Sequence, residues 1–328
     1  MVVRFNFQDA KQTFVVIREG DGEASLSFLG SMTSNLPASE PPFNGSPASD
    51  SPRPRQVLKA GGGGASLNFH EIWLYRDLLW ALSSREIKLR YRQTALGAIW
   101  VIIQPIMSAG ILSFVFNGVA GLKTGDVPPF LFTYAGTLIW TVFNTTLSKA
   151  SSVLVGNASL ISKVYFPRLC LPLSVVPPVL LDLGVSLVML TALLIKFGIL
   201  PTIAVFLWPL VLLITLMMAL GIALVAASLM VSYRDVQYII PVALNLLFFA
   251  SPVAYATSEV AKKVPAWAVG IYNLNPLVGL LEASRFCLIG QGEVNAGALA
   301  YSTIGAVIVF AIGMKCFKAM ERKFADVI

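Results

Sequence analysis

Apolar runs about as long as a bilayer is thick dominate this chain of 328 residues. They cover approximately residues 96–118, 129–147, 171–195, 202–231, 238–255 and 298–318. About 20 residues of α-helix cross the ~30 Å of hydrocarbon in a membrane. Only 12% of the residues are charged, whereas a soluble domain has about 25%. The sequence therefore predicts an all-α membrane protein with six transmembrane helices.

A basic, aromatic stretch runs into the first of these segments. Arg85, Lys88 and Arg92 fall on one edge of a helical wheel, whereas Trp80 falls on another side. Amphipathic helices of this kind lie in the headgroup layer, so residues 66–96, with Arg76 near their start, are predicted to form an interface helix. Lys and Arg residues are more frequent on its side of the membrane, which indicates that both termini are cytoplasmic. The net charge of +7 is assigned to loops that face anionic lipid rather than to nucleic-acid binding.

The first 65 residues differ from the rest of the chain. Residues 2–7 and 13–18 alternate weakly between apolar and polar, which favours a hairpin. Residues 36–65 are rich in Pro, Ser and Gly and predict a flexible linker. The expected organisation is a disordered or loosely ordered cytoplasmic extension over 1–65, the interface helix over 66–96 and a transmembrane domain over 97–328. The extension is either a small accessory or a dispensable tail.

Residues 259–297 hold two apolar pieces that are too short to cross a membrane. Asn275 and Pro276 form a helix-start signal before the second piece. We therefore expect two short re-entrant helices between the fifth and sixth spans, a form of backbone tolerated only against protein or a water-filled path. Glu282 and Arg285 are three residues apart on the second helix and are predicted to pair. The pair would either brace this hairpin or touch an anionic substrate.

Residues able to support chemistry are few. Asp182 is an acidic residue deep within a span, which makes it a candidate for transport or for a structural hydrogen bond to a neighbouring helix. No P-loop pattern and no paired carboxylates at a membrane face occur, so neither a nucleotide site nor a catalytic site is predicted. The three cysteines and the single histidine, His70, have no metal-binding spacing. We expect no enzyme activity, no cofactor and no metal in this chain.

The cytoplasmic loop after the second span mixes apolar and basic residues in the stretch NASLISKVYFPRLCLP (157–172). Pro167 ends any helix there. The remaining side chains of interest are four large ones expected to be exposed and two basic ones: Leu160, Ile161, Tyr165, Phe166, Lys163 and Arg168. Such a surface is either a protein-docking site, with Tyr165 and Phe166 as anchors, or an interfacial helix that rests on lipid.

Six stretches recur in the order of a known family. They are RDLLWALSSREIKLRYRQTALGAIWVIIQP (76–105), NASLISKVYFPRLCLPLS (157–174), LLDLG around Asp182, VSYRDVQYIIP (231–241), SPVAY (251–255) and NPLVGLLEASRFCLIG (275–290). With these stretches, residues 72–328 resemble the membrane subunit of ABC-2-type ABC transporters, in the branch that exports polysaccharides such as O-antigen, teichoic acid and capsule. Residues 1–65 lie outside the resemblance.

The resemblance implies a homodimer in the bacterial cytoplasmic membrane with two copies of a separate ATPase, which would hold ATP and Mg. It implies that residues 157–168 are the coupling helix and that Arg234 and Asp235 belong to a second ATPase contact. It also implies a translocation path between the two copies, whose exit the re-entrant helices shape. Aromatic side chains that stack on sugar rings would line this path, and the candidates are Trp100, Phe248, Phe249 and Tyr255. Lipid-facing or packing roles for these aromatics remain equally open.

The leading functional hypothesis is therefore the pore-forming permease of an ATP-driven exporter for a lipid-linked polysaccharide. One alternative is export of a drug, a lipid or another small amphiphile by the same architecture. The stretch KVYFPR (163–168), which resembles the sugar branch, favours the polysaccharide. A membrane-embedded sugar transferase is an alternative from another class, but acidic pairs are missing from the cytoplasmic face. A secondary transporter is disfavoured by the scarcity of charges within the spans.

Overall fold

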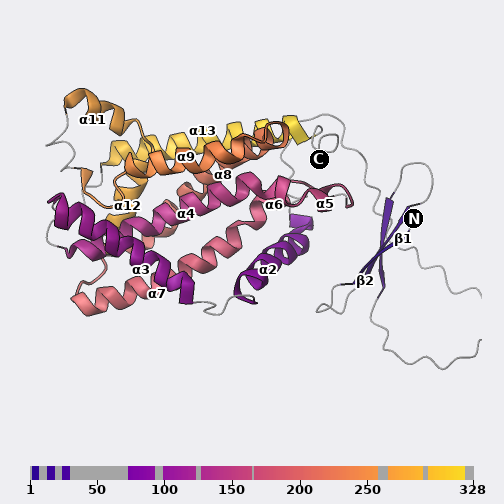
Figure 1. Cartoon of the computed structure of the whole chain (residues 1–328), viewed down its shortest axis with the longest axis horizontal. Coiled ribbons are helices and arrows are strands. Elements are labelled where there is room, and N and C mark those ends of the chain that lie inside the picture. Colours follow the sequence, from indigo (N-terminus) through magenta and orange to yellow (C-terminus); the bar gives the residue numbers. More distant parts are fainter. Residues whose placement is uncertain are drawn as a thin grey trace, which may run out of the picture. The chain divides into compact units, whose positions relative to one another are not determined.

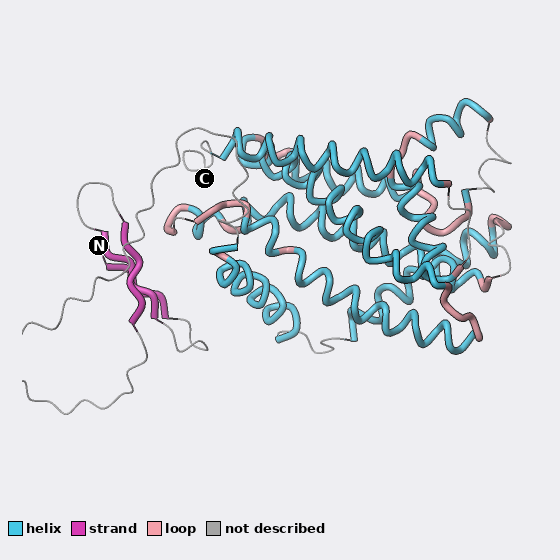
Figure 2. Tube along the Cα trace, turned by 180° about the vertical axis from the view of Figure 1, so that it is seen from behind, coloured by secondary structure: helices cyan, strands magenta, loops and turns pink. Residues whose placement is uncertain are grey.

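The computed structural model describes residues 2–6, 13–18, 24–29, 73–92, 99–122, 127–164, 166–257, 265–290 and 295–321. The chain divides into two compact units, Met1–Ser66 and Leu67–Ile328. This division falls within one residue of the predicted end of the N-terminal extension. The two units are drawn in Figures 1 and 2 and are described separately below.

The first unit contains a three-stranded antiparallel sheet in the order β1-β2-β3. Its strands are β1 (Val2–Asn6), β2 (Thr13–Arg18) and β3 (Ala24–Leu29). Phe5 lies opposite Phe14 in the first pair, and Phe14 lies opposite Phe28 in the second. The predicted hairpin is confirmed, whereas the third strand was not predicted, and the all-α description applies to the second unit. The linker predicted over 36–65 lies outside the described residues.

The described part of the second unit is helical (Figure 2). In chain order its first elements are α2 (Arg76–Arg92), α3 (Ile99–Ser113), the π-helical η1 (Phe114–Val119), α4 (Pro129–Gly156), α5 (Ala158–Ile161) and α6 (Cys170–Ser174). Then follow α7 (Val176–Phe197), the 3-10 helix η2 (Ile203–Leu207), α8 (Trp208–Ser232), α9 (Val236–Phe249), α11 (Ala266–Asn273), α12 (Leu277–Ile289) and α13 (Ala296–Glu321). Each predicted apolar segment overlaps one of these helices or two helices in series.

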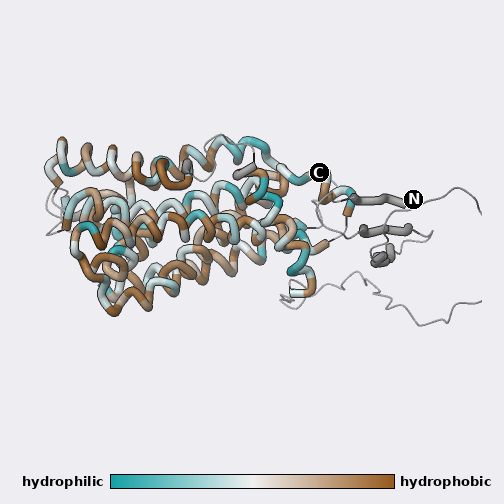
Figure 3. Tube along the Cα trace, turned by 90° about the horizontal axis from the view of Figure 1, so that it is seen from below, coloured by the Kyte–Doolittle hydropathy of each residue, from teal (hydrophilic) through white to brown (hydrophobic). Residues whose placement is uncertain are grey.

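Four helical segments of the described chain are long and apolar enough to cross a membrane: Trp100–Val119, Cys170–Phe197, Ile203–Ser232 and Ala296–Glu321. The predicted second span lies in α4, which has 28 residues but carries many Thr and Ser side chains. The predicted fifth span is α9, which has only 14 residues. Hydrophobic residues run along the helices in Figure 3, and hydrophilic residues gather toward one end of the bundle. The second unit is thus a multi-pass membrane bundle.

Helix α4 is the centre of this bundle, because it packs against α3, α7, α8, α9 and α12. Leu131, Tyr134 and Phe143 on α4 are buried almost completely. A proline at its first position, Pro129, suits the start of a helix, where the missing N–H would have no partner. Helix α7, which flanks α4, ends at Gly198 in the left-handed conformation that glycine adopts without strain. Side chains on α4 can therefore meet residues from most of the unit.

Candidate functional site

The α5 segment (residues 157–168), in which the coupling element was expected, is held in the bundle by apolar side chains. Ile161 and Phe166 are only 8% and 5% exposed. They belong to a buried cluster with Leu154 and Leu171, to which α8 contributes Leu224 and α13 contributes Phe317. The prediction that Ile161 and Phe166 are exposed is therefore wrong, and Phe166 is not an exposed docking anchor. Removing such side chains from water is favourable, and α8 and α13 supply apolar surface to cover them.

Helical structure in this segment is shorter than expected. Helix α5 covers only Ala158–Ile161 and is followed by a turn. Leu160 and Pro167 are half-buried, whereas Lys163 is exposed. Tyr165, the other predicted anchor, lies outside the described residues. The exposed side chains of the segment are small or polar: Ser159, Ser162 and Lys163.

The end of the segment is fastened to the last helix, because the Nη1 group of Arg168 donates a hydrogen bond to the backbone oxygen of Glu321 at the end of α13. A movement of the α5 segment would therefore be transmitted to α8 through the buried cluster and to α13 through Arg168. Arg234 and Asp235, the predicted second contact, are exposed in the turn before α9. The sequence analysis did not single out the exposed Ser159 and Ser162, because small polar residues give no local signal that distinguishes them.

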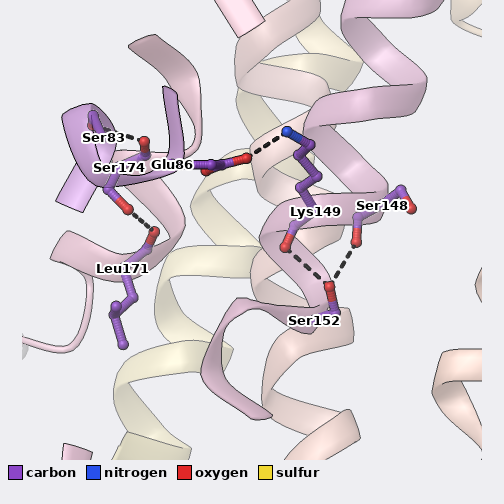
Figure 4. Close-up of polar contacts among 7 residues, drawn as sticks. All are labelled: Ser83, Glu86, Ser148, Lys149, Ser152, Leu171 and Ser174. Atoms are coloured by element: carbon purple, nitrogen blue, oxygen red, sulfur yellow. Dashed lines mark hydrogen bonds and ion pairs between the residues drawn. The ribbon is translucent and has the colours of Figure 1, made fainter. Parts of the chain in front are cut away.

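Helix α2 is bound to the bundle by polar contacts (Figure 4). The Nζ group of Lys149 on α4 forms an ion pair with the carboxylate of Glu86 on α2. The hydroxyl of Ser83 lies 2.8 Å from the backbone oxygen of Ser174 on α6, to which it donates a hydrogen bond. These contacts join residues 63 and 91 positions apart, and no local pattern in the sequence indicates them. They fix α2 to both helices that flank the α5 segment.

The basic residues predicted for the interface helix lie on the outer side of α2 where they are described. Arg85 and Lys88 are exposed. The guanidinium group of Arg76 lies 5.4 Å from the ring centroid of Trp73 and forms an exposed ion pair with Asp77. The side chain of Arg92 lies outside the described residues. This arrangement agrees with the predicted edge of basic residues, and its position in a headgroup layer stays a prediction.

A cavity of about 460 Å³ lies between α3, α4, α7 and the end of α9. Trp140 and Phe248 form an aromatic wall, with ring centroids 5.3 Å apart in an edge-to-face arrangement. The rest of the lining is rich in polar side chains that are able to form hydrogen bonds: Gln104, Ser108, Thr137, Thr141, Asn144, Thr145, Asp182 and Ser186. We call this space the membrane cavity.

The structure brings together some of the predicted path residues and separates others. Asp182 and Phe248 line the membrane cavity. Trp100 is half-exposed and, at helical spacing from Gln104, shares that side of α3. Phe249 contacts Phe248 but is 66% exposed, and it does not line the cavity. Tyr255 is also absent from the cavity lining and is buried, so these two aromatics have roles other than the cavity wall.

Sequence reasoning missed most of the cavity's polar lining, although a signal was present. Thr137, Thr141 and Asn144 recur at intervals of four and three residues on α4. Such residues lie on one face of a helix. A polar stripe within a membrane helix indicates a face that meets polar partners, water or ligand. The stripe alone did not show that α3 and α7 would contribute to the same cavity.

A second group of predicted residues meets near the start of α4 and is called the loop clamp. It holds the buried loop 251–255 between α4 and α12. The Nη1 group of Arg285 donates a hydrogen bond of 3.0 Å to the backbone oxygen of Tyr255. The guanidinium carbon also lies 4.4 Å from the ring centroid of Phe132 on α4. Arg285, which is 2% exposed, thus links three parts of the bundle.

Among the described residues, Glu282 and Arg285 do not form the predicted ion pair. The ion pairs found there join other residues. The guanidinium group of Arg285 instead bonds to the carbonyl of Tyr255 and stacks on the ring of Phe132. Both partners are distant in sequence and pack around this buried group, which needs such contacts in place of water. Tyr255 itself packs on Phe116, with ring centroids 5.6 Å apart. Its hydroxyl donates a hydrogen bond to the backbone oxygen of Phe249. Bracing, one of the two roles foreseen for Arg285, fits this geometry.

Asn275 completes the loop clamp. Its side-chain amide donates hydrogen bonds to the hydroxyl of Ser251 at 2.9 Å and to the backbone oxygen of Ala250 at 3.2 Å. Its side-chain oxygen accepts a hydrogen bond from the backbone N–H of Leu277. The predicted helix-start signal is therefore confirmed, with Pro276 immediately before α12 rather than at its first position.

Comparison with known proteins decides the family. A sequence profile described as ABC-2 type transporter matches residues 77–289, which run from α2 to the end of α12. The chain belongs to the ABC-2 type transporter family. The resemblance found in the sequence is thus confirmed over most of the membrane unit.

Individual ABC-2 relatives align over nearly their full lengths. The O-antigen export system permease protein RfbA of Myxococcus xanthus is 31% identical over 78% of this chain and 97% of the relative. A protein of the same name from Klebsiella pneumoniae is 25% identical over 77% of the chain and 95% of the relative. The polysialic acid transport protein KpsM of Escherichia coli is 25% identical over 74% of the chain and 93% of the relative.

Proposed function

We propose that this chain is the pore-forming permease subunit of an ATP-driven exporter that moves a lipid-linked polysaccharide across the bacterial cytoplasmic membrane. The observation that carries the proposal is the alignment with an O-antigen export permease over 97% of that relative's length. The aligned length of 256 residues is close to the 262 residues of the second unit, Leu67–Ile328. Two chains form a homodimer in this proposal, and the glycan passes between them.

Energy for export enters through a separate ATPase subunit, present in two copies. The sequence has no P-loop pattern, so ATP and Mg are held by that partner. In the proposed topology both termini are cytoplasmic, six helices cross the membrane, and α11 and α12 are re-entrant. The α5 segment then lies on the cytoplasmic side, where an ATPase can contact it.

The geometry of the α5 segment divides it into a contact face and a transmission face. Ser159, Ser162 and Lys163 are exposed and provide the contact with the ATPase. Ile161 and Phe166 are embedded against α8 and α13 and carry movement into the bundle. Closure of two ATPase subunits would thereby become a rigid-body movement of the two bundles.

Association with the ATPase tests this proposal. We would purify the tagged full-length chain and quantify the ABC ATPase that copurifies. Reversing the charge on the contact face by Lys163→Glu is expected to weaken ATPase association by about fivefold or more. Lys196→Glu is the matched control, because Lys196 is also exposed but lies at the end of α7. If no ATPase copurifies with the native chain, the proposal is contradicted. If Lys163→Glu and Lys196→Glu bind the ATPase equally well, the α5 segment is not the contact.

A further inference from the structure

The membrane cavity has an unusual chemistry for a space within a membrane bundle. Polar side chains from three helices line it, including Gln104 from α3, Asn144 from α4 and Asp182 from α7. Its volume of about 460 Å³ lies within the range of roughly 300–1,000 Å³ that is usual for small-molecule sites. It is open to the outside of the single chain, because Gln104, Ser108 and Thr141 are all exposed.

Several of these groups have capacity for a ligand. In the part of the chain that the structure describes, Gln104, Ser108, Thr141 and Asn144 form no hydrogen bond with protein. Thr137, by contrast, donates to the backbone oxygen of Tyr134. Polar groups at membrane depth that lack protein partners cost free energy unless water or a ligand binds them. Four such groups around one opening indicate a binding site rather than packing.

The charge of the lining restricts what can bind. Among the described lining residues, Asp182 is the only acidic or basic side chain, and none is Lys or Arg. Moving an anion to this depth without a cation to pair it is strongly unfavourable. Lys149 is the next basic residue along α4, and its ammonium group pairs with Glu86. The lining therefore disfavours phosphate groups and acidic sugars.

Hydroxyl-rich neutral rings suit the remaining features. Amide and hydroxyl side chains exchange hydrogen bonds with sugar hydroxyls, and the faces of Trp140 and Phe248 offer apolar contact to the C–H side of a ring. A carboxylate near such a ring also accepts hydrogen bonds from hydroxyl or ammonium groups.

We propose that the membrane cavity binds neutral or amino-sugar units of the transported glycan and selects against acidic sugars and against the phosphate of the lipid linkage. This inference rests on the proposed function and deepens it by naming the substrate class. The cavity is formed within a single chain, so each copy in the proposed homodimer carries one such site.

Two variants fill the polar side of the cavity with apolar atoms at exposed positions, where folding is least affected: Gln104→Leu and Thr141→Val. Thr191→Val is the matched control, because Thr191 is exposed on α7 and does not line the cavity. Each variant would replace the native gene on the chromosome. Surface glycan would be measured per amount of membrane-inserted chain, with ATPase copurification as the check on assembly. We expect each cavity variant to lower export about two- to tenfold, the effect of one lost hydrogen bond, and the control to leave it unchanged.

The sugar composition of the glycan that disappears on gene deletion completes the test. The inference expects neutral or amino sugars and no uronic or sialic acid. A lost glycan built from acidic sugars, or normal export by both cavity variants, overturns the inference while leaving the proposed function intact. If gene deletion removes no surface glycan, the proposed function itself fails, and the inference fails with it.

Discussion

Substitution of Gly136 by alanine is expected to destabilise the bundle at the loop clamp. A Cβ atom added at Gly136 on α4 would lie 2.1 Å from the backbone oxygen of Val253. Carbon and oxygen atoms do not approach so closely, so either α4 or the loop 251–255 must shift. Neither can shift freely, because Asn275 holds Ser251 and Arg285 holds Tyr255 by hydrogen bonds.

The expected magnitude follows from two opposing terms. Extra atoms in a well-packed core cost about 1–3 kcal/mol, and a clash with backbone lies at the upper end of that range. Replacing glycine by alanine within a helix returns up to about 1 kcal/mol. The net loss for Gly136→Ala is therefore about 2 kcal/mol in the free energy of unfolding.

Gly184→Ala is the matched control for this substitution. Gly184 lies within α7, and an added Cβ there would meet no atom within 4 Å. Only the helix-propensity term applies, so this variant should be as stable as the native chain or slightly more stable. Thermal unfolding of the detergent-solubilised protein, followed by loss of the folded peak on size exclusion, compares the two. Equal stability of both variants would refute the close contact between α4 and the loop.

Substitutions at three further sites test other parts of the structure. Glu86→Lys should lower the free energy of unfolding by about 0.5–1 kcal/mol, a small effect because the ion pair in Figure 4 is partly exposed. Adding Lys149→Glu should restore the lost stability. A double variant that stays as unstable as Glu86→Lys would show that the pair is not formed. Phe166→Ala should lower the free energy of unfolding by about 3–5 kcal/mol and reduce the amount of folded chain in the membrane, since the side chain is buried in the cluster with α8 and α13. Normal thermal stability of this variant would contradict the burial of Phe166 and favour an exposed docking role. Asp182→Asn should retain more export than Asp182→Leu if hydrogen bonding is the role of this residue, and export equal to that of the leucine variant with normal folding would indicate a role for the charge.

The positions of the apolar helices could be predicted from sequence, because hydropathy is a local property of the chain. The segment predicted over 202–231, for example, corresponds to η2 and α8, which cover residues 203–232. The start of α12 could be predicted for the same reason, since Asn275 acts on the N–H of Leu277, only two residues away. The depth of each helix in the bilayer is not a local property, and the six-span topology stays a proposal.

Predictions that depended on distant contacts failed or were incomplete. Ile161 and Phe166 were expected to be exposed because their own segment offers nothing to cover them, yet residues of α8 and α13 do so. Arg285 was assigned to Glu282, its neighbour on the helix, but its partners are the carbonyl of Tyr255 and the ring of Phe132. The polar stripe on α4 was visible in the sequence, but only the packing of three helices turns it into a cavity.

The location of lipid-linked glycan in cells that lack this gene tests the central claim most directly. Polymer would be quantified separately at the cell surface and in the cytoplasmic leaflet, in the deletion strain and after complementation with the native chain. The account predicts that surface glycan is lost while lipid-linked polymer accumulates inside, and that the native chain reverses both changes. Normal surface glycan without internal accumulation would contradict the assignment of this chain as a glycan export permease.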